Sequence, residues 1–423
     1  MKSENDKNLM INMRLMKMIG LYQILSPNSP KILGINIFKY LTIIQLFIIQ
    51  ISAFEFISNI YFCWDNINEV TKYCMYLQSD VIATIQLYYV LKKSNEIWNC
   101  IRLTSTSHLA YKYHSRRIFE AGQSKSKSYS VLIMLLWVTL VVSWILVPYM
   151  VKNYYIEVNV ENVVYRYRFS ALNCLYPVTD KFYNEHFIAY YCVESIILMC
   201  WGHIRMIFDV LGTSMCITIA FQLKMIANSF SMLNITDNHS TNYHFDSDNA
   251  TKLIECKEST FIVNFKVLVQ DQQKVVENMK NIYRILRSVM LLQIALNSLT
   301  TILLCSITIM NYFNGLSLTS PMNIRLLMAI VTYSSHIFFI CYLFEDINEQ
   351  KESLNFALYS SGWTESSIKC KKILLLAMRL NNAEKLKLQI TKKQIVNFEL
   401  FTSIMQTTYS VSSLLVKQCS KKM

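Results

Sequence analysis

The chain has 423 residues, of which 53% are hydrophobic and 16% charged, with a net charge of +13. Soluble proteins usually carry about 25% charged residues, and 7 Gly and 5 Pro argue against a glycine-rich phosphate loop or a turn-rich β-sandwich. The positive charge does not indicate nucleic acid, because membrane proteins concentrate Lys and Arg on their cytoplasmic side. Apolar runs of about 20 residues have the length of a bilayer-crossing helix. The predicted fold class is an all-α polytopic membrane protein.

Seven transmembrane helices are predicted in chain order. They cover approximately residues 40–62, 73–91, 131–150, 187–223, 289–313, 326–344 and 395–416. The second is the weakest, because Asp80 and Gln86 interrupt it. The fourth run is too long for one crossing, so its end is expected to project from the membrane as a helix.

The orientation follows from Lys and Arg in the connections. The N-terminal segment and the second, fourth and sixth connections are rich in both, whereas the first and fifth carry only Lys72 and Arg325. This pattern predicts an N-terminus inside and a C-terminus outside, the reverse of a G-protein-coupled receptor. Three glycosylation sequons fall in the fourth connection, on the predicted inner side, where we interpret them as chance matches. They are Asn234, Asn238 and Asn249.

The predicted organisation has five parts. They are a cytoplasmic N-terminal segment (1–39), a six-span helical domain with extended intracellular helices (40–344), a cytoplasmic anchor and assembly segment (345–394), the last span (395–416) and an extracellular tail (417–423).

The cytoplasmic side is expected to be helical. Before the fifth span, one helical face is apolar: Leu268, Val275, Val276, Met279, Ile282 and Leu286. A second amphipathic helix begins near Thr364, a plausible N-cap. These helices would form a packed intracellular layer where subunits meet; the alternative is that they rest on lipid headgroups.

No enzyme signature, metal-ligand spacing or cofactor motif is present, so the chain is predicted not to be an enzyme and to use no cofactor. Ionisable groups within spans are costly. Glu55, Asp80 and Glu194 are therefore expected to face protein or a water-filled cavity. Arg205 and Asp209, four residues apart, are expected to pair.

The last span carries a polar stripe at helical spacing. Its members are Ser403, Gln406, Ser410, Ser413 and Lys417, and the neighbouring stripe holds Phe401, Met405, Thr408, Ser412 and Val416. Two interpretations remain open from the residues alone. The hydroxyls pack against neighbouring helices while bonding their own i−4 carbonyls, or they line water in a pore of several subunits.

The C-terminal motifs resemble those of the insect odorant receptors, the heteromeric odorant-gated cation channels. The resemblance is most specific in "YSSHIFFICYLFEDINEQ", "ALYSSGWTE" and "FELFTSIMQTTYSVSSLLVK". Residues at pattern positions are Tyr342, Glu345, Tyr359, Trp363, Tyr409 and Ser410. Gln272 and Gln273 stand where the family commonly has His. The gustatory-receptor ending and the co-receptor's long loop and ending are not matched, which favours a tuning subunit.

The resemblance implies a heterotetramer with the odorant-receptor co-receptor, in the plasma membrane of olfactory sensory neurons. Cytoplasmic helices would join the subunits, and the last spans would surround a pore for cations. It places pore residues at Gln406, Tyr409, Ser412, Ser413 and Val416, with the gate at Ser412 and Val416.

The implied ligand is a small volatile molecule bound in the outer half of the helical domain. Candidate contacts are Tyr76, Leu77, Ser143, Trp144, Val147, Tyr191, Glu194 and Tyr333. The alternatives are a gustatory-type channel that assembles alone and a G-protein-coupled receptor.

Overall fold

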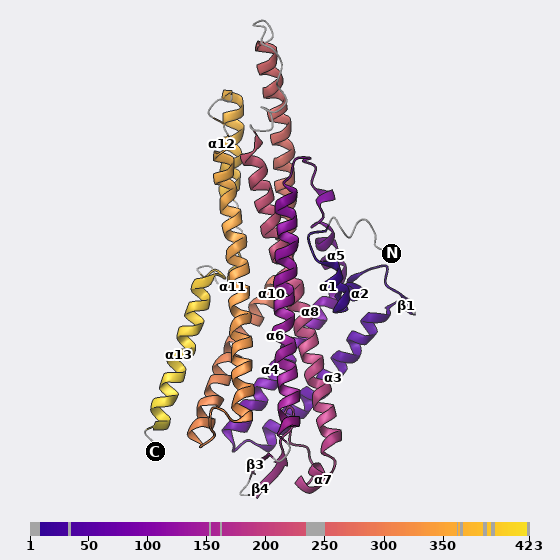
Figure 1. The fold of residues 1–423 in the computed structure, drawn as a ribbon, viewed down its shortest axis with the longest axis vertical. Helices are drawn as coiled ribbons and strands as arrows, with labels where there is room; N and C mark the ends of the chain where they lie inside the picture. The colour runs from indigo at the N-terminus through magenta and orange to yellow at the C-terminus, as the bar shows by residue number, and fades with distance from the viewer. Residues whose placement is uncertain are drawn as a thin grey trace.

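The protein is described from a computed structural model. The described residues are 9–32, 35–151, 154–160, 163–233, 250–361, 363, 367–383, 387–390 and 394–420. Long helices run side by side along one axis, with two short hairpins (Figure 1). The helices are α1 (Met13–Met18), α2 (Leu21–Leu25), α3 (Ile37–Phe62), α4 (Ile67–Lys92), α5 (Ser94–Arg102), α6 (Arg116–Met150), α7 (Asp180–Glu185), α8 (Phe187–Ser231), α10 (Ala250–Phe313), α11 (Pro321–Tyr359), α12 (Ile368–Ala383) and α13 (Phe398–Ser420), and the strands are β1 (Lys31–Ile32), β2 (Ile35–Asn36), β3 (Tyr155–Val160) and β4 (Val163–Arg168).

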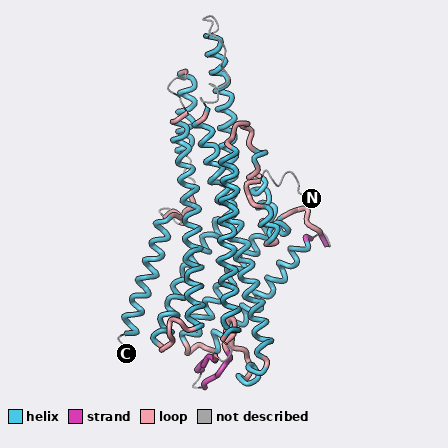
Figure 2. Tube along the Cα trace, in the orientation of Figure 1, coloured by secondary structure: helices cyan, strands magenta, loops and turns pink. Residues whose placement is uncertain are grey.

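The bundle has two distinct ends (Figure 2). The antiparallel β3–β4 hairpin, in which Tyr155 pairs with Arg168, lies at one end together with the C-terminal end of α13. We call this the hairpin end. Helix α12 and the first half of α10 lie at the opposite end, the α12 end. By the Lys and Arg distribution, the hairpin end is expected outside the cell and the α12 end inside.

Within the described residues, five helices are long and apolar enough to cross a membrane. They are α3, α6, α8, α11 and the Ser259–Phe313 part of α10. Helix α4 also has the length, and its polar residues point inward rather than to lipid. Asp80, almost fully buried, accepts hydrogen bonds from Ser52 Oγ at 3.2 Å and Trp201 Nε1 at 2.6 Å. The prediction that Asp80 faces protein is therefore confirmed.

The long helices continue well past the membrane. Helix α8 runs 45 residues, which confirms the predicted projection of the fourth run. Helix α10 runs unbroken into the fifth span, and every member of its predicted apolar face, from Leu268 to Leu286, is buried. The three sequons and the predicted cap Thr364 lie outside the described residues.

Helix α11 crosses the predicted domain boundary between residues 344 and 345 without a break. It begins with Pro321 at its first turn and Ser320 as N-cap, whose hydroxyl accepts from Asn323 N at 3.3 Å. No Pro or Gly interrupts it before Tyr359, so backbone hydrogen bonding continues from the span into the anchor segment.

Toward the α12 end, a buried carboxylate holds the loop before α6. Asp271 on α10 accepts from Ala110 N at 2.8 Å and Tyr111 N at 2.9 Å. His114 lies between Ser229 Oγ at 2.8 Å and Asp271 at 3.3 Å. Burial lowers the pKa of His114, although its hydrogen bond to Asp271 and the charge of Asp271 oppose the shift.

Candidate ligand cavity and last helix

A cavity of about 60 Å³ lies between five long helices, α4, α6, α8, α10 and α11. Its lining is dominated by aromatic and aliphatic side chains, with one cation. The lining residues are Met75, Tyr76, Ser79, Trp137, Leu140, Val141, Trp144, Leu198, Trp201, Gly202, Arg205, Leu304, Ala329 and Tyr333. Such an apolar, concave site with few polar groups is typical of small-molecule binding.

Helical periodicity explains why these side chains meet. The α6 residues in the lining are spaced i, i+3, i+4 and i+7, from Trp137 to Trp144. The α8 residues follow the same spacing, from Leu198 to Arg205. Positions with this spacing share one helix face, so each helix presents a single stripe to the cavity.

The cavity lies in the half of the bundle next to the hairpin end. Met75 and Ser79 are eight and twelve residues after the start of α4, and Ala329 and Tyr333 stand equally far into α11. At 1.5 Å rise per residue, these positions lie about 12–18 Å from that end. The cavity therefore lies in the half of the bundle where the candidate ligand contacts are expected, and its role as the odorant site stays a prediction.

Five of the fourteen lining residues are aromatic. Tyr76 contacts Trp144 and Trp201 with ring centroids 6.1 and 5.9 Å away, and Trp137 meets Tyr333 edge to face at 5.9 Å. These separations are those of favourable aromatic pairs. These packed rings give the cavity a wall that suits apolar or aromatic ligands.

A buried polar network begins at the side of the cavity that faces the α12 end. Asp209 on α8 accepts from Trp137 Nε1 at 2.7 Å and Gln293 Nε2 at 2.8 Å. His336 Nε2 lies 2.9 Å from the same carboxylate. The network therefore joins α6, α8, α10 and α11 on the side of the aromatic rings that faces the α12 end.

Arg205 belongs to both the cavity lining and this network. Its Nη1 donates to Asn297 Oδ1 at 3.3 Å, and its guanidinium lies 5.9 Å from the Trp137 ring. Asn297 Nδ2 lies 3.0 Å from His336 Nδ1. No direct ion pair joins Arg205 to Asp209 among the described residues, because His336, Trp137 and Gln293 occupy the carboxylate.

On the hairpin side, the segment 170–174 covers the bundle, and Glu194 on α8 holds it. The fully buried carboxylate accepts from Ser170 Oγ at 2.7 Å and from Leu172 N at 2.6 Å. It also accepts from Asn173 N and Cys174 N, each at 3.2 Å. A carboxylate with this many donors is a structural clamp.

Arg325 on α11 holds the same segment from the other side. Its Nη1 donates to Ser170 O at 3.1 Å and Ala171 O at 2.9 Å. The guanidinium stacks on Phe169 at 4.1 Å and Trp144 at 5.1 Å. Trp144 therefore separates the cavity from Arg325 and the covering segment.

The structure brings Tyr76, Trp144 and Tyr333 into the cavity lining. The other candidate contacts lie elsewhere. Tyr191 donates its hydroxyl to Ile145 O, and Glu194 is committed to the covering segment. The remaining candidates outside the lining are Leu77, Ser143 and Val147.

Sequence reasoning missed Trp137, Trp201 and Arg205. A signal was available, because Leu198, Trp201 and Arg205 lie on the same α8 face as Glu194, at helical spacing. The candidates on α8 were placed too close to the hairpin end.

Helix α13 turns its polar stripe outward. Ser403, Gln406, Ser410 and Lys417 are exposed, and Tyr409 is 75% exposed. Ser413 is half-buried and Val416 is exposed. Ser410 Oγ bonds Gln406 O at 2.9 Å, so this hydroxyl is satisfied within its own helix.

The neighbouring stripe packs toward the bundle. Thr408 is buried and bonds Ile404 O at 2.9 Å. Ser412, half-buried, lies with its hydroxyl against the Cys305 thiol of α10. Of the proposed gate positions, Ser412 thus faces α10 in this protomer, while Val416 lies at the border of the exposed face.

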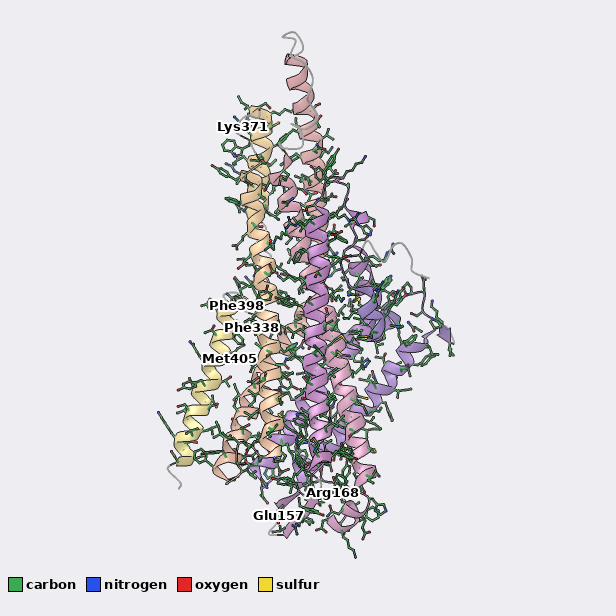
Figure 3. The ribbon with its side chains drawn as sticks, in the orientation of Figure 1. Glu157, Arg168, Phe338, Lys371, Phe398 and Met405 are labelled. Atoms are coloured by element: carbon green, nitrogen blue, oxygen red, sulfur yellow. The ribbon has the colours of Figure 1, made fainter. Side chains whose placement is uncertain are left out.

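Aromatic contacts attach the first turn of α13 to α11. Phe338 on α11 lies 5.6 Å from Phe398 and 5.5 Å from Phe401, and these rings stand near Met405 (Figure 3). Tyr342 adds a contact with Phe398 at 6.0 Å. The α13 end that leads to the exposed stripe is therefore coupled by packing to a helix that lines the cavity.

Among the described residues, no group of three His, Cys, Asp or Glu side chains is placed to hold a metal ion. The family model described as 7tm Odorant receptor matches residues 55–409. No curated protein matches the chain.

Two solved structures share the fold. The insect olfactory receptor OR5 from Machilis hrabei aligns with a TM-score of 0.70 and 14% identity, covering 96% of this chain and 98% of that chain. The structure of the same receptor in complex with eugenol aligns with a TM-score of 0.72 and 12% identity, again covering 96% and 98%.

Proposed function

The chain belongs to the 7tm odorant receptor family, and from this premise we propose that it is the odorant-binding subunit of a ligand-gated, non-selective cation channel. The ligand would be a small volatile molecule in the cavity between α4, α6, α8, α10 and α11. The pore would be lined by α13, together with the last helices of partner subunits. The observation that carries the proposal is the pairing of an apolar cavity with an outward polar stripe on the last helix.

The cavity supports the receptor half of the proposal. Tyr76, Trp144 and Tyr333 are the proposed ligand contacts, joined by Trp137 and Trp201. The receptor from Machilis hrabei was solved in complex with eugenol, a small aromatic molecule, and aromatic walls suit ligands of that kind.

The exposed stripe of α13 supports the channel half. The Ser410 hydroxyl is satisfied by its own helix, but the exposed Gln406 amide and Lys417 ammonium need water or another subunit, because lipid offers them no hydrogen bonds. Gln406, Tyr409 and Ser413 are the proposed pore residues. Val416 would supply an apolar constriction that gates by dewetting, and Ser412 would influence it from the α10 side.

The partner is proposed to be the odorant-receptor co-receptor in a heterotetramer, at the plasma membrane of olfactory sensory neurons. Exposed apolar residues on α12 give the assembly a contact surface at the α12 end, with Leu376 and Leu380 each more than half exposed. Membrane lipid would cover the outward face of α3, where Phe47 and Phe54 are exposed.

The test is co-expression with a co-receptor and recording of currents across a broad odorant panel. Odorant-evoked cation currents that require both chains are expected. Currents from this chain alone would favour the gustatory-type alternative. An N-terminal tag accessible on intact cells would reverse the topology and remove the channel proposal. Ser412→Leu is expected to alter resting leak, because it enlarges a side chain packed between α13 and α10.

A further inference from the structure

We propose that the cavity selects small neutral molecules that carry a hydrogen-bond acceptor, such as a ketone, aldehyde or ester carbonyl, and that Arg205 is the selecting donor. This inference rests on the proposed function, because it concerns the ligand of the same cavity. Two observations support it: the unused hydrogen-bond donors among the lining residues, and the charges of the polar network that borders the cavity toward the α12 end.

Arg205 is a buried cation with unused donors. Its side chain lines the cavity, and the residue is 3% exposed. A guanidinium has five N–H donors, and among the described residues the one acceptor recorded for them is Asn297 Oδ1. Buried donors without acceptors are costly, so an acceptor on the ligand stabilises the occupied cavity.

Trp144 is a second unused donor. Its Nε1 is buried and has no hydrogen-bond partner in the described part of the chain. The other two indoles of the wall are satisfied, since Trp137 donates to Asp209 and Trp201 donates to Asp80. Arg205 therefore presents its free donors to the cavity from the α8 side, and a ligand that accepts hydrogen bonds complements it. Trp144 Nε1 has no surface open to the empty cavity and would donate only to a ligand that displaces its neighbours.

The network beneath the cavity holds one carboxylate, Asp209, close to the guanidinium of Arg205. Arg205 can only donate, so the oxygen of Asn297 faces it and the amide nitrogen of Asn297 donates to His336 Nδ1. His336 Nδ1 is then an acceptor, and its Nε2 lies 2.9 Å from Asp209 and 3.2 Å from Gln293 Nε2. The carboxylate of Asp209 balances the charge of Arg205 across this network.

This balance excludes charged ligands. A carboxylate would bring an uncompensated charge into a site whose cation is already neutralised, and an ammonium group would lie beside Arg205. A neutral carbonyl adds an acceptor without adding charge. The size of the cavity limits the ligand further. Its volume of about 60 Å³ is that of only a few water molecules, each of which takes roughly 10–15 Å³ when volume is counted in the same way.

The experiment compares matched ligands on cells that express this chain with a co-receptor. The probes are methyl ketones and acetate esters of four to eight carbons, the alkenes in which a methylene replaces the carbonyl oxygen, and the carboxylates of equal length. We expect the carbonyl compounds to evoke currents at concentrations about tenfold or more below their alkene matches, because a hydrogen bond to a charged donor is lost in the alkene. Carboxylates should be weaker still.

Two variants assign the preference to its residues. Arg205→Met should bring the carbonyl-to-alkene potency ratio close to one, and Trp144→Phe should lower it with less disturbance of the network. Trp98→Phe, on α5 against Tyr22, is the matched control and should leave the ratio unchanged. Surface labelling establishes that each variant reaches the membrane.

The outcomes separate the two proposals. Alkenes or carboxylates as potent as the carbonyl compounds overturn the ligand assignment and leave the channel standing. A ratio that persists in Trp144→Phe and in a surface-expressed Arg205→Met removes both residues from selection. Silence to every probe overturns the ligand class, and the resting currents of Val416→Ala, which need no ligand, then report whether the chain forms a channel.

Discussion

Glu194 is the residue for which sequence and structure suggest different roles, so Glu194→Gln is the most informative substitution. The side-chain amide keeps the shape of the carboxylate but replaces one oxygen with an N–H donor. When the new amide nitrogen points toward Cys174 N, two N–H donors face each other. The bond from Cys174 N is then lost and a buried N–H is left unpaired, which lowers the free energy of unfolding by about 1–3 kcal/mol.

The other bonds weaken as well. Ser170, Leu172 and Asn173 would donate to a neutral oxygen, and charge-assisted bonds are roughly twice as strong as neutral ones, so about 1 kcal/mol is lost for each. Removing a buried charge offsets several kcal/mol of this loss. The net destabilisation is about 2 kcal/mol, which for a chain of this size lowers the melting temperature by roughly 2 °C.

The assay is thermal unfolding of the detergent-purified receptor, paired with odorant dose–response curves. Glu185→Gln, on the exposed end of α7, is the matched control and should melt like the parent. We expect Glu194→Gln to melt early while the rank order of odorants stays unchanged. A parental melting temperature would refute the clamp, and a changed rank order with parental stability would instead make Glu194 a ligand contact.

Three further outcomes are expected. Gly202→Ala adds a methyl group that meets Val141 Cγ2 at 2.4 Å at the cavity wall, so responses to the largest active odorants should fall severalfold. The control is Gly212→Ala, whose methyl group meets Met290 outside the cavity. It should shift stability but leave the odorant size preference unchanged. Val416→Ala shortens the proposed apolar constriction, and resting current should rise in voltage-clamp recordings unless this residue lies away from the pore. Asp271→Asn weakens the bonds to the loop before α6. Thermal unfolding of the purified receptor should then show a loss of about 1–3 kcal/mol of stability. The control, Glu277→Gln at an exposed position, should show no such loss.

The helices at the α12 end were the most predictable part of the fold. The face from Leu268 to Leu286 could be identified because helix periodicity and burial act along a single continuous element. The extension of α8 beyond one bilayer thickness followed from its length alone. These features depend on local sequence, and tertiary contacts do not reverse them.

The cavity was less predictable because depth along a helix depends on how neighbouring helices are staggered. Trp144 and Tyr76 were found as aromatics in the outer half, but Arg205 was read only as a partner for Asp209. Its actual surroundings depend on His336, which lies 131 positions further along the chain. Periodicity identifies a helix face but not the depth at which another helix meets it.

The same limit applies to Glu194 and Ser412. A carboxylate inside a span signals a special environment, but nothing in the sequence says that backbone N–H groups from residues 172–174 will fill it. The predicted division of α13 into two stripes holds for Ser403, Gln406 and Thr408 but not for Ser413 and Val416, and only the packing against Cys305 shows which way Ser412 turns.

The clamped segment 170–174 has a consequence for how a stimulus arrives. If the cavity is the odorant site, as proposed, this cover leaves the bilayer as the route of approach, and the effective dose of a volatile compound would be the amount held in the lipid. Among compounds that fit equally well, sensitivity should then rise with the oil–water partition coefficient, and responses should outlast a rinse of the surrounding fluid for as long as the membrane retains the compound.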